Sequence, residues 1–336
     1  MTQTYRVVIT DYIADELEPE KQVLAEIARV EALDADKEDD LVGRIEDADA
    51  IILYHKLALT RKTISRLKRC KLIVRGGVGY DNVDHVFAGE CGIPVANVPD
   101  YGSEEVADSA IGMTLALTRG IALANSRLRD RLGEWNHHQV VPLRRLRGRV
   151  LGIVGLGRIG TAVALRGKAL GMDVAFYDPY KPDGYDKALG IRRVETLYEL
   201  LEQSFVLTIH CPLTDETHHM IDAAAIDKLP QGAYLINTAR GAVVDTRAIP
   251  AAIRSGRLAG AGIDVLEQEP PSDNDPLIAA WRDPEHPAYH RVLINPHSAF
   301  YSEEGLLDMR VKGAIACRRA LLNQGIPNQV NCESMT

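Results

Sequence analysis

The chain has 336 residues, enough for two domains, and its 46% hydrophobic and 26% charged content is typical of a globular protein. A net charge of −8 argues against a nucleic-acid partner, because binding to phosphates requires a basic surface. The polar N-terminus lacks a signal-peptide core and no apolar run is long enough to span a membrane, so we expect neither secretion nor membrane association.

Strand and helix patterns alternate over the first hundred residues, which predicts a small parallel sheet covered by helices. The expected strands are Tyr5–Thr10, Ala50–Tyr54, Lys71–Val74 and Pro94–Val98, and the expected helices are Glu20–Val30, Thr60–Arg69 and Asn82–Glu90. From Ser103 a helix runs to about Ala124. It is too apolar for a surface helix, so we expect it to be buried between domains or subunits. An irregular arm follows over residues 135–149.

A second alternation begins at Val150 and predicts a second parallel sheet. Its expected strands are Leu151–Val154, Asp173–Tyr177, Val206–His210, Ala233–Asn237, Gly260–Val265 and Val292–Asn295, with a helix at Thr246–Ser255. Residues 270–290 are expected to form a loop insertion with a helical turn near Leu277–Trp281. A final amphipathic helix, about Glu303 to Asn323, would return to the first domain, which would then be discontinuous.

The segment Val150–Gly160 contains three glycines in a G-x-G-x-x-G pattern between a strand and a helix. In this pattern the first glycine makes a tight turn, the second admits a pyrophosphate and the third allows close packing of helix on strand. Asp178 follows the next strand, where a carboxylate binds the ribose 2′-hydroxyl and repels a 2′-phosphate. The pattern therefore predicts a dinucleotide site that prefers NAD(H) over NADP(H).

Three residue types suited to carbonyl chemistry follow the later strands. Ligands of open parallel sheets bind at the carboxyl ends of the strands. Arg240 could hold a carboxylate through two hydrogen bonds, and His297 could act as a proton donor near neutral pH. Either Glu267 or Glu269 could orient the histidine. Hydride transfer to a ketone needs this combination of a cation and a proton donor.

Other polar residues are weaker candidates. The adjacent pairs His137–His138 and His218–His219 cannot share a helix face, so no metal site is expected there. The five cysteines show no C-x-x-C spacing, which favours free thiols in the cytoplasm over disulfides or zinc. The loop Arg75–Asn82 is either a simple turn or an anion-binding turn, because its glycines allow backbone N–H groups to face an anion.

Together, these motifs resemble the D-isomer-specific 2-hydroxyacid dehydrogenase family over nearly the whole chain. The resemblance rests on the Gly-Val-Gly-Tyr-Asp-Asn loop, on Gly155–Gly160 and on Asn237–Gly241, Asp264–Pro270 and Pro296-His297. Within the family the chain is most similar to the C-terminal-binding-protein branch, in residues 163–171, 176–180 and 297–304.

The resemblance implies a role for each site residue. Arg240 would bind the substrate carboxylate and keto oxygen, Glu269 rather than Glu267 would support the histidine, and His297 would donate the proton. Further substrate contacts would come from Arg75, Val78, Gly79 and Phe300. The cofactor would be NAD(H), bound by Gly155, Gly157, Arg158, Ile159, Gly160, Asp178, Cys211, Pro212, Thr217, Thr238, Ala239, Arg240, Asp264 and His297.

The resemblance also implies an α/β fold of two Rossmann-like domains. A flavodoxin-like substrate domain would comprise residues 1–101 and 298–336, and the NAD-binding domain, residues 102–297, would be inserted into it. A helix and arm at about 103–148 would form a homodimer interface.

Two departures from the C-terminal-binding-protein branch leave the substrate open: Phe300 stands where that branch has a tryptophan, and residues 270–290 are longer. The leading interpretation is an NAD(H)-dependent reductase that converts a small 2-keto acid, such as glyoxylate or hydroxypyruvate, to a D-2-hydroxy acid. The alternative is an NAD(H)-sensing corepressor-like binding protein with weak or vestigial dehydrogenase activity. We expect no long regulatory tail after the last helix, which favours the enzyme.

Overall fold

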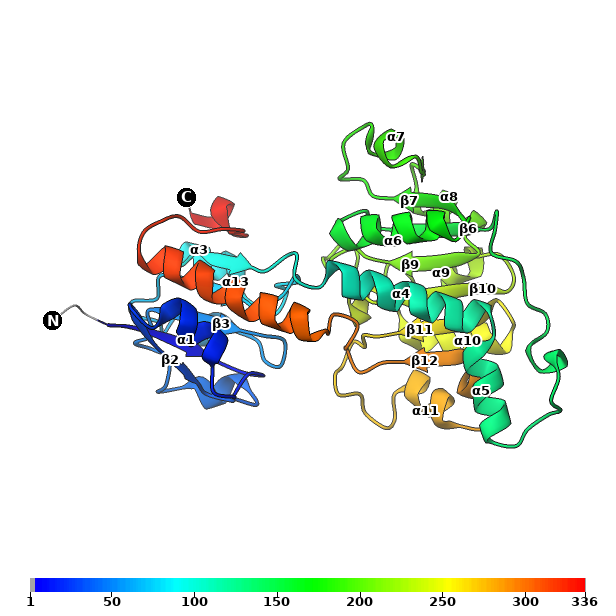
Figure 1. The fold of residues 1–336 in the computed structure, drawn as a ribbon, viewed down its shortest axis with the longest axis horizontal. Helices are drawn as coiled ribbons and strands as arrows, with labels where there is room; N and C mark the ends of the chain where they lie inside the picture. The colour runs from blue at the N-terminus through cyan, green and yellow to red at the C-terminus, as the bar shows by residue number, and fades with distance from the viewer. Residues whose placement is uncertain (1–3, 336) are drawn as a thin grey trace. The chain divides into compact units, whose positions relative to one another are not determined.

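The computed structural model describes residues 4–335, which form two compact units (Figure 1). One unit comprises the chain up to Gly102 together with Ser302 onward, and the other spans Ser103–Tyr301. Each unit contains one parallel sheet flanked by helices, which confirms the predicted α/β fold class.

The first unit has a five-stranded parallel sheet in the order β2-β1-β3-β4-β5, the flavodoxin-like order. Its strands are β1 (Tyr5–Ile9), β2 (Ala28–Ala32), β3 (Ala50–Leu53), β4 (Ile73–Arg75) and β5 (Val95–Asn97). Its helices are α1 (Glu18–Leu24), α2 (Arg61–Ile64), α3 (His85–Glu90) and α13 (Glu303–Leu321), with 3-10 turns at Glu38–Leu41 and Cys332–Met335. Strand β3 is wholly apolar and buried, and β1, β4 and β5 are mostly buried, as expected of a covered parallel sheet, whereas the edge strand β2 contains Arg29 and Glu31 and is only partly buried.

Helix α13 joins the first unit although it lies some 200 residues further along the chain. It packs beside α1 (Figure 1), and an ion cluster centred on the buried Arg310 fixes this contact. Arg310 donates to Glu20 at 2.7 Å and to Asp15 at 2.6 and 2.8 Å. Because Glu20 and Arg310 are both buried, removing Arg310 would leave the Glu20 carboxylate as an uncompensated charge inside the unit.

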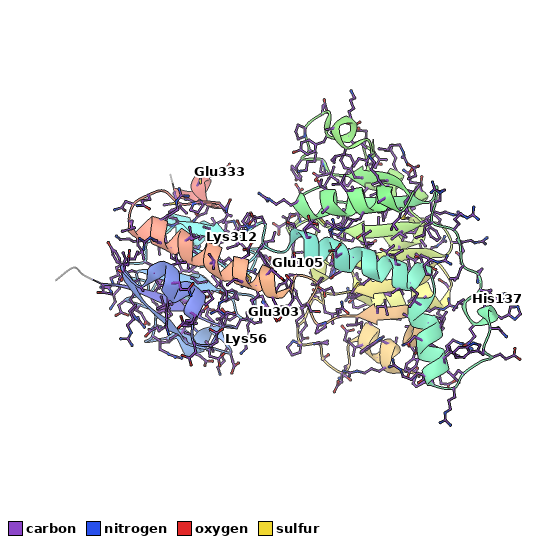
Figure 2. All side chains as sticks on the ribbon, viewed as in Figure 1. Lys56, Glu105, His137, Glu303, Lys312 and Glu333 are labelled. Atoms are coloured by element: carbon purple, nitrogen blue, oxygen red, sulfur yellow. The ribbon has the colours of Figure 1, made fainter. Side chains whose placement is uncertain are left out.

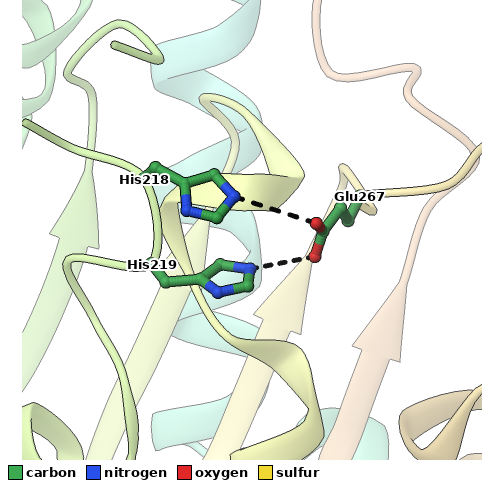
Figure 3. A group of neighbouring side chains, drawn as sticks. All are labelled: His218, His219 and Glu267. Atoms are coloured by element: carbon green, nitrogen blue, oxygen red, sulfur yellow. Dashed lines mark hydrogen bonds and ion pairs between the residues drawn. The ribbon is translucent and has the colours of Figure 1, made fainter. Parts of the chain in front are cut away.

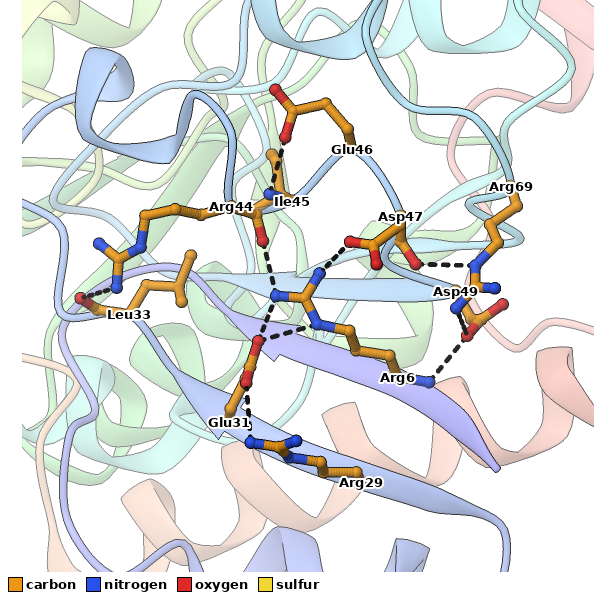
Figure 4. A network of polar contacts seen from close by, with 10 residues as sticks. All are labelled: Arg6, Arg29, Glu31, Leu33, Arg44, Ile45, Glu46, Asp47, Asp49 and Arg69. Carbon is orange, nitrogen blue, oxygen red and sulfur yellow. Dashed lines mark hydrogen bonds and ion pairs between the residues drawn. The ribbon is translucent and has the colours of Figure 1, made fainter. Parts of the chain in front are cut away.

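One predicted helix in this unit was correct in its first half and wrong in its second half. The segment expected as a helix over 20–30 contains α1 and then the edge strand β2, which pairs in parallel with β1 from Tyr5↔Ala28 to Ile9↔Ala32. Ala and Glu favour a helix locally, but pairing with β1 overrides that preference. Arg6 of β1 reinforces the pairing (Figure 4), since its Nε donates to Glu31 of β2 at 2.9 Å.

The second unit has a seven-stranded parallel sheet in the order β12-β11-β10-β9-β6-β7-β8. Its strands are β6 (Val150–Val154), β7 (Asp173–Tyr177), β8 (Arg192–Arg193), β9 (Val206–Ile209), β10 (Ala233–Asn237), β11 (Leu258–Ile263) and β12 (Val292–Ile294). The direction of strand succession reverses between β6 and β9, and such a switch point is where doubly wound sheets bind ligands.

Helices cover both faces of this sheet. They are α4 (Ser103–Thr118), α5 (Ile121–Arg129), α6 (Arg158–Ala169), α7 (Tyr185–Leu189), α8 (Leu197–Gln203), α9 (Ala223–Lys228), α10 (Ile249–Arg254), α11 (Pro276–Arg282) and α12 (Ala288–Arg291). Short 3-10 turns lie at His137–Val140, Gly241–Val243 and Thr246–Ala248. Helices α4 and α6 lie side by side on one face, and α8, α9 and α10 cover the other (Figure 1).

The long apolar helix expected from Ser103 to about Ala124 is two helices, because Gly120 takes a left-handed conformation with φ 65°. The buried face of α4, which includes Ala107, Met113 and Leu117, packs on the sheet of its own unit, whereas α5 has no buried residue. Among the described residues no single helix is long and apolar enough to cross a membrane; α4 and α5 satisfy the length and composition criteria only as a pair bent by 63°.

The helical turn expected near Leu277–Trp281 is confirmed as α11, and the arm expected to be irregular contains one short helical turn. The arm after α5 has one 3-10 turn at His137–Val140, and residues 270–290 contain α11 and the start of α12. Helix α11 begins where Asp275 accepts hydrogen bonds from the backbone N–H groups of Leu277 and Ile278 at 2.9 and 3.0 Å.

Candidate active site

The glycine-rich turn between β6 and α6 has a different constraint at each glycine. Gly155 has a left-handed φ of 87°, and a Cβ there would lie 2.7 Å from the backbone nitrogen of Cys211. A Cβ on Gly160 would lie 2.2 Å from the carbonyl oxygen of Gly155, so helix and turn touch through backbone. A Cβ on Gly157 would meet no atom within 4 Å, so the backbone is open on that side.

This geometry fits the pyrophosphate of a dinucleotide. Arg158 and Ile159 begin the 12-residue helix α6, whose first N–H groups have no intrahelical partner and carry the positive end of the helix dipole. Asp178, at the end of β7, accepts hydrogen bonds from the backbone N–H of Leu156 at 2.8 Å and of Tyr180 at 3.0 Å. Its carboxylate is thus anchored beside the turn, where a ribose of the cofactor would be bound.

The loop after β9 is held in shape by Thr217. Its hydroxyl donates to the carbonyl of Pro212 at 2.7 Å and accepts from the N–H of Thr214 at 2.8 Å. At the start of this loop, burial raises the pKa of the Cys211 thiol to about 12, so Cys211 is neutral at physiological pH. Nε2 of the preceding His210 lies 2.8 Å from the Thr208 hydroxyl, and burial lowers the His210 pKa to about 3.

The turn after β10 positions Arg240 through a residue that the sequence analysis did not single out. The fully buried Asn237 accepts a hydrogen bond from the N–H of Ala239 at 3.0 Å and donates one to the carbonyl of Arg240 at 2.9 Å. An asparagine at the end of a strand is a common turn former, so this signal was present in the sequence. The buried hydroxyl of Thr238, a predicted cofactor contact, has no hydrogen-bond partner within residues 4–335, so a polar group of a bound cofactor could satisfy it.

His297 and Glu269 form a direct pair. Nδ1 of His297 lies 2.7 Å from Oε2 of Glu269, and the other carboxylate oxygen accepts the N–H of Leu266 at 2.7 Å. Both side chains are partly exposed, 23% and 34% respectively. Glu269 therefore fixes the ring through Nδ1, so that Nε2 is the nitrogen that can face a substrate. Glu267, the other carboxylate considered from sequence, faces His219 instead, at 3.0 Å.

Asp264 holds the backbone around His297. One carboxylate oxygen of this buried residue accepts the N–H groups of Ser298 at 2.9 Å and Ala299 at 3.0 Å, and its carbonyl accepts the N–H of His297 at 2.8 Å. Burial raises the pKa of Asp264 above its ordinary value. His297 has a left-handed φ of 52°, a conformation that non-glycine residues keep only where their surroundings impose it.

The loops after β10, β11 and β12 are in mutual contact. A Cβ on Gly241 would lie 2.0 Å from the backbone carbon of Leu266, so the Arg240 turn packs directly on the loop that leads to Glu269. The Phe300 ring lies edge-on to the His297 ring, with centroids 6.1 Å apart. The structure thus pairs Glu269 with His297 directly and links Arg240 to them through packed backbone.

The remaining predicted substrate residues, Arg75, Val78 and Gly79, belong to the first unit. Arg75 ends β4, is 6% exposed and donates to the carbonyl of Gly76 at 3.1 Å. The Val78 carbonyl accepts from the Asn97 side chain at 2.6 Å. Their contact with a substrate stays a prediction.

Comparison with known proteins gives matches to one enzyme family and to two curated relatives. Residues 111–299 match the family described as "D-isomer specific 2-hydroxyacid dehydrogenase, NAD binding domain". The chain is 34% identical to D-3-phosphoglycerate dehydrogenase of Methanocaldococcus jannaschii over 89% of its length, and 33% identical to C-terminal-binding protein 1 of Caenorhabditis elegans over 90%. It spans only 54% and 41% of those two proteins, about half their length.

Solved structures match along nearly the whole chain. D-lactate dehydrogenase of Aquifex aeolicus, complexed with NAD and lactic acid, has a TM-score of 0.83 at 28% identity, with 98% of this chain and 97% of that one covered. A glyoxylate reductase from Paecilomyes thermophila has a TM-score of 0.84 at 28% identity, with 98% and 99% covered.

Proposed function

Because the chain belongs to the D-isomer-specific 2-hydroxyacid dehydrogenase family, we propose that it is an NAD(H)-dependent oxidoreductase that reduces a small 2-keto acid to a D-2-hydroxy acid. The observation that carries this proposal is the pair of His297 and Glu269, 2.7 Å apart, at the carboxyl edge of the sheet that also bears the glycine-rich turn. The second unit would be the NAD-binding domain and the first unit the substrate domain.

The proton that reaches the carbonyl oxygen would come from Nε2 of His297. Glu269 accepts the hydrogen of Nδ1, which fixes the ring orientation, and its second oxygen is itself held by the N–H of Leu266. A carboxylate in this position also stabilises the cationic imidazolium that is the proton donor. After transfer the neutral ring retains its hydrogen bond to Glu269 and can be reprotonated by water.

Arg240 would bind the carboxylate and the keto oxygen of the substrate, since its planar guanidinium can donate two parallel hydrogen bonds. The same positive charge would stabilise the negative charge that develops on the keto oxygen during reduction. When bound, NADH supplies the hydride. Asp178 would favour NADH over NADPH, because a carboxylate at the ribose repels a 2′-phosphate.

The test is a substrate panel. Purified protein would be mixed with NADH or NADPH and with glyoxylate, hydroxypyruvate, pyruvate or 3-phosphohydroxypyruvate, and cofactor oxidation followed by absorbance. We expect NADH-dependent turnover with at least one 2-keto acid and slower turnover with NADPH. A protein that binds NADH but oxidises it with none of these acids would refute the enzyme assignment.

We further propose that the protein is a cytoplasmic homodimer. All five cysteines are free, as expected in a reducing compartment. Helix α5 and the arm after it expose large apolar side chains, with Ile121 60%, Trp135 89% and Val141 57% exposed. Exposed apolar side chains of this size support a contact with a second copy. Sedimentation with and without NADH tests this: a monomer at micromolar concentration in both conditions would contradict it.

A second candidate function is an NAD(H)-sensing binding protein. The 33% identity to C-terminal-binding protein 1 of Caenorhabditis elegans over 90% of this chain favours it. The two functions differ in their response to NADH. A sensor would turn over slowly and assemble only with dinucleotide, whereas an enzyme would turn over rapidly and assemble with or without it.

A further inference from the structure

Two adjacent histidines and a glutamate converge outside the proposed catalytic pair (Figure 3). Nε2 of His219 lies 3.0 Å from one carboxylate oxygen of Glu267, and Nε2 of His218 lies 4.0 Å from the other. All three candidate ligand atoms lie within 4.8 Å of one another. In the part of the chain that the structure describes, no other group of three such side chains meets this criterion.

The backbone explains how neighbouring histidines can face one carboxylate. The segment is a turn rather than a helix, so the expectation that adjacent residues diverge does not apply. His219 has a left-handed φ of 48°, and its N–H donates to the carbonyl of Ala242 at 2.7 Å. The two rings stack with centroids 4.0 Å apart and planes inclined by 27°, which turns both Nε2 atoms to the same side (Figure 3).

We propose that His218, His219 and Glu267 bind one divalent transition-metal ion of the zinc class. Two imidazoles and a carboxylate are ligands that Zn²⁺, Co²⁺ and Ni²⁺ accept, whereas Mg²⁺ and Ca²⁺ prefer oxygen alone. Metal–ligand bonds of about 2.0–2.2 Å place tetrahedral ligand atoms about 3.4 Å apart. The observed distances from the Glu267 carboxylate oxygens to the two Nε2 atoms, 3.0 and 4.0 Å, bracket that value. Side-chain movements of about an ångström would therefore close the site around an ion.

The surroundings favour a single cation. His218 and Glu267 are 53% and 52% exposed, so an ion can enter directly and complete its coordination with water. Asp245 interacts electrostatically with His219 and adds negative charge. Arg247 is the opposing positive charge, but it is held by Asp245 at 2.7 and 3.0 Å. The Asp245–Arg247 pair is therefore close to neutral, and the metal-binding cluster, defined here as His218, His219 and Glu267, carries the negative charge of Glu267 to attract a cation.

A bound ion would join two loops that carry predicted active-site residues. His218 directly follows Thr217 in the loop after β9, and Glu267 lies two residues before Glu269 in the loop after β11. The proposal does not depend on the catalytic assignment, since metal binding is measured without substrate or NADH.

The experiment measures Zn²⁺ binding to metal-stripped full-length protein by isothermal titration calorimetry, and Co²⁺ binding by its visible absorption. The variants are Glu267→Gln and His219→Asn, with the double variant His137→Asn/His138→Asn as a matched control. The control pair is also adjacent in sequence, with ring centroids 4.4 Å apart, and His137 lies on the arm after α5 (Figure 2). Thermal unfolding checks that each variant is folded.

We expect one Zn²⁺ per wild-type chain and per control chain. Loss of a partner outside the coordination sphere already costs about 10–100-fold in metal affinity, so loss of a direct ligand should weaken binding by at least tenfold in both cluster variants. The Co²⁺ spectrum should lose its tetrahedral bands in the same two variants. The proposal is overturned if the wild-type protein binds no Zn²⁺, or if Glu267→Gln and His219→Asn bind it as tightly as wild type.

Discussion

The substitution Asp264→Ala tests whether this buried carboxylate holds the His297 loop in place. It removes the acceptor of two backbone hydrogen bonds, from Ser298 at 2.9 Å and Ala299 at 3.0 Å. A buried donor left without a partner costs about 1–3 kcal/mol, so two donors cost about 2–6 kcal/mol. Removing a charge whose burial is itself unfavourable offsets part of this, because burial raises the pKa of Asp264. We expect a net loss of about 2–4 kcal/mol of unfolding free energy.

The substitution Asp264→Asn keeps a hydrogen-bond acceptor at this position but removes the negative charge. The amide oxygen can still accept both N–H groups, but neutral hydrogen bonds are weaker than charge-assisted ones by about 1 kcal/mol each. We therefore expect Asn to lose about 1–2 kcal/mol, less than Ala. The turnover number should fall about 10–100-fold in the Ala variant, because an ångström of displacement in a catalytic group can cost that much. The control Asp273→Ala, at an exposed ion pair, should change stability by less than about 0.5 kcal/mol.

Urea unfolding followed by tryptophan fluorescence is the assay. The chain has two tryptophans, Trp135 and Trp281, and both belong to the second unit, so the signal reports the unit that contains Asp264. If Asp264→Ala unfolds within 0.5 kcal/mol of wild type and keeps its turnover number, the carboxylate does not hold the loop and the reasoning is refuted.

Three further predictions follow from the same structure. Gly241→Ala should lower stability by about 1–3 kcal/mol or more in urea unfolding, because its Cβ would overlap the backbone of Leu266 at 2.0 Å; unchanged stability would contradict the packing. Asp178→Ser should shift the ratio of kcat/KM for NADH over NADPH towards NADPH by about tenfold or more, since it removes the repulsion of a 2′-phosphate; an unchanged ratio would exclude Asp178 from the ribose site. Burial lowers the pKa of His210 to about 3, so this side chain binds a proton more readily in the unfolded chain than in the folded one. Wild type should therefore lose stability relative to His210→Gln as the pH falls from 6.5 towards 3. A difference between their urea midpoints that does not change with pH would refute this.

Local signals predicted most of the fold. Strand β10 was predicted at its observed bounds, because an apolar run that ends at a turn-forming asparagine is readable without knowledge of its partners. Strand β2 was missed because Ala28–Ala32 becomes a strand only through pairing with β1, which lies more than twenty residues away. The break between α4 and α5 has a local cause in Gly120, so closer attention to glycine within the apolar run would have found it.

The candidate site also has features that local sequence predicted and features that it did not predict. Because the glycine pattern and Asp178 are close in sequence, their spacing alone predicted that they belong to the same dinucleotide site. Spacing alone left the choice between Glu267 and Glu269 open, because it depends on which way each side chain leaves its loop. The family resemblance implied Glu269, and the structure places Glu269 against His297 and Glu267 against His219. Asn237 acts through hydrogen bonds to its own turn, whereas the sequence analysis considered it only as the end of a strand and the first residue of the Asn237–Gly241 motif.

The most direct test of the central claim compares turnover and NADH binding in wild type and His297→Ala, using the keto acid that the substrate panel identifies. NADH affinity, measured by fluorescence, should stay within a few-fold of wild type, because the glycine-rich turn and Asp178 are untouched. The turnover number should fall by about 10²–10⁴-fold, the usual contribution of a positioned proton donor. A His297→Ala protein that binds NADH and reduces the keto acid at the wild-type rate would contradict the account.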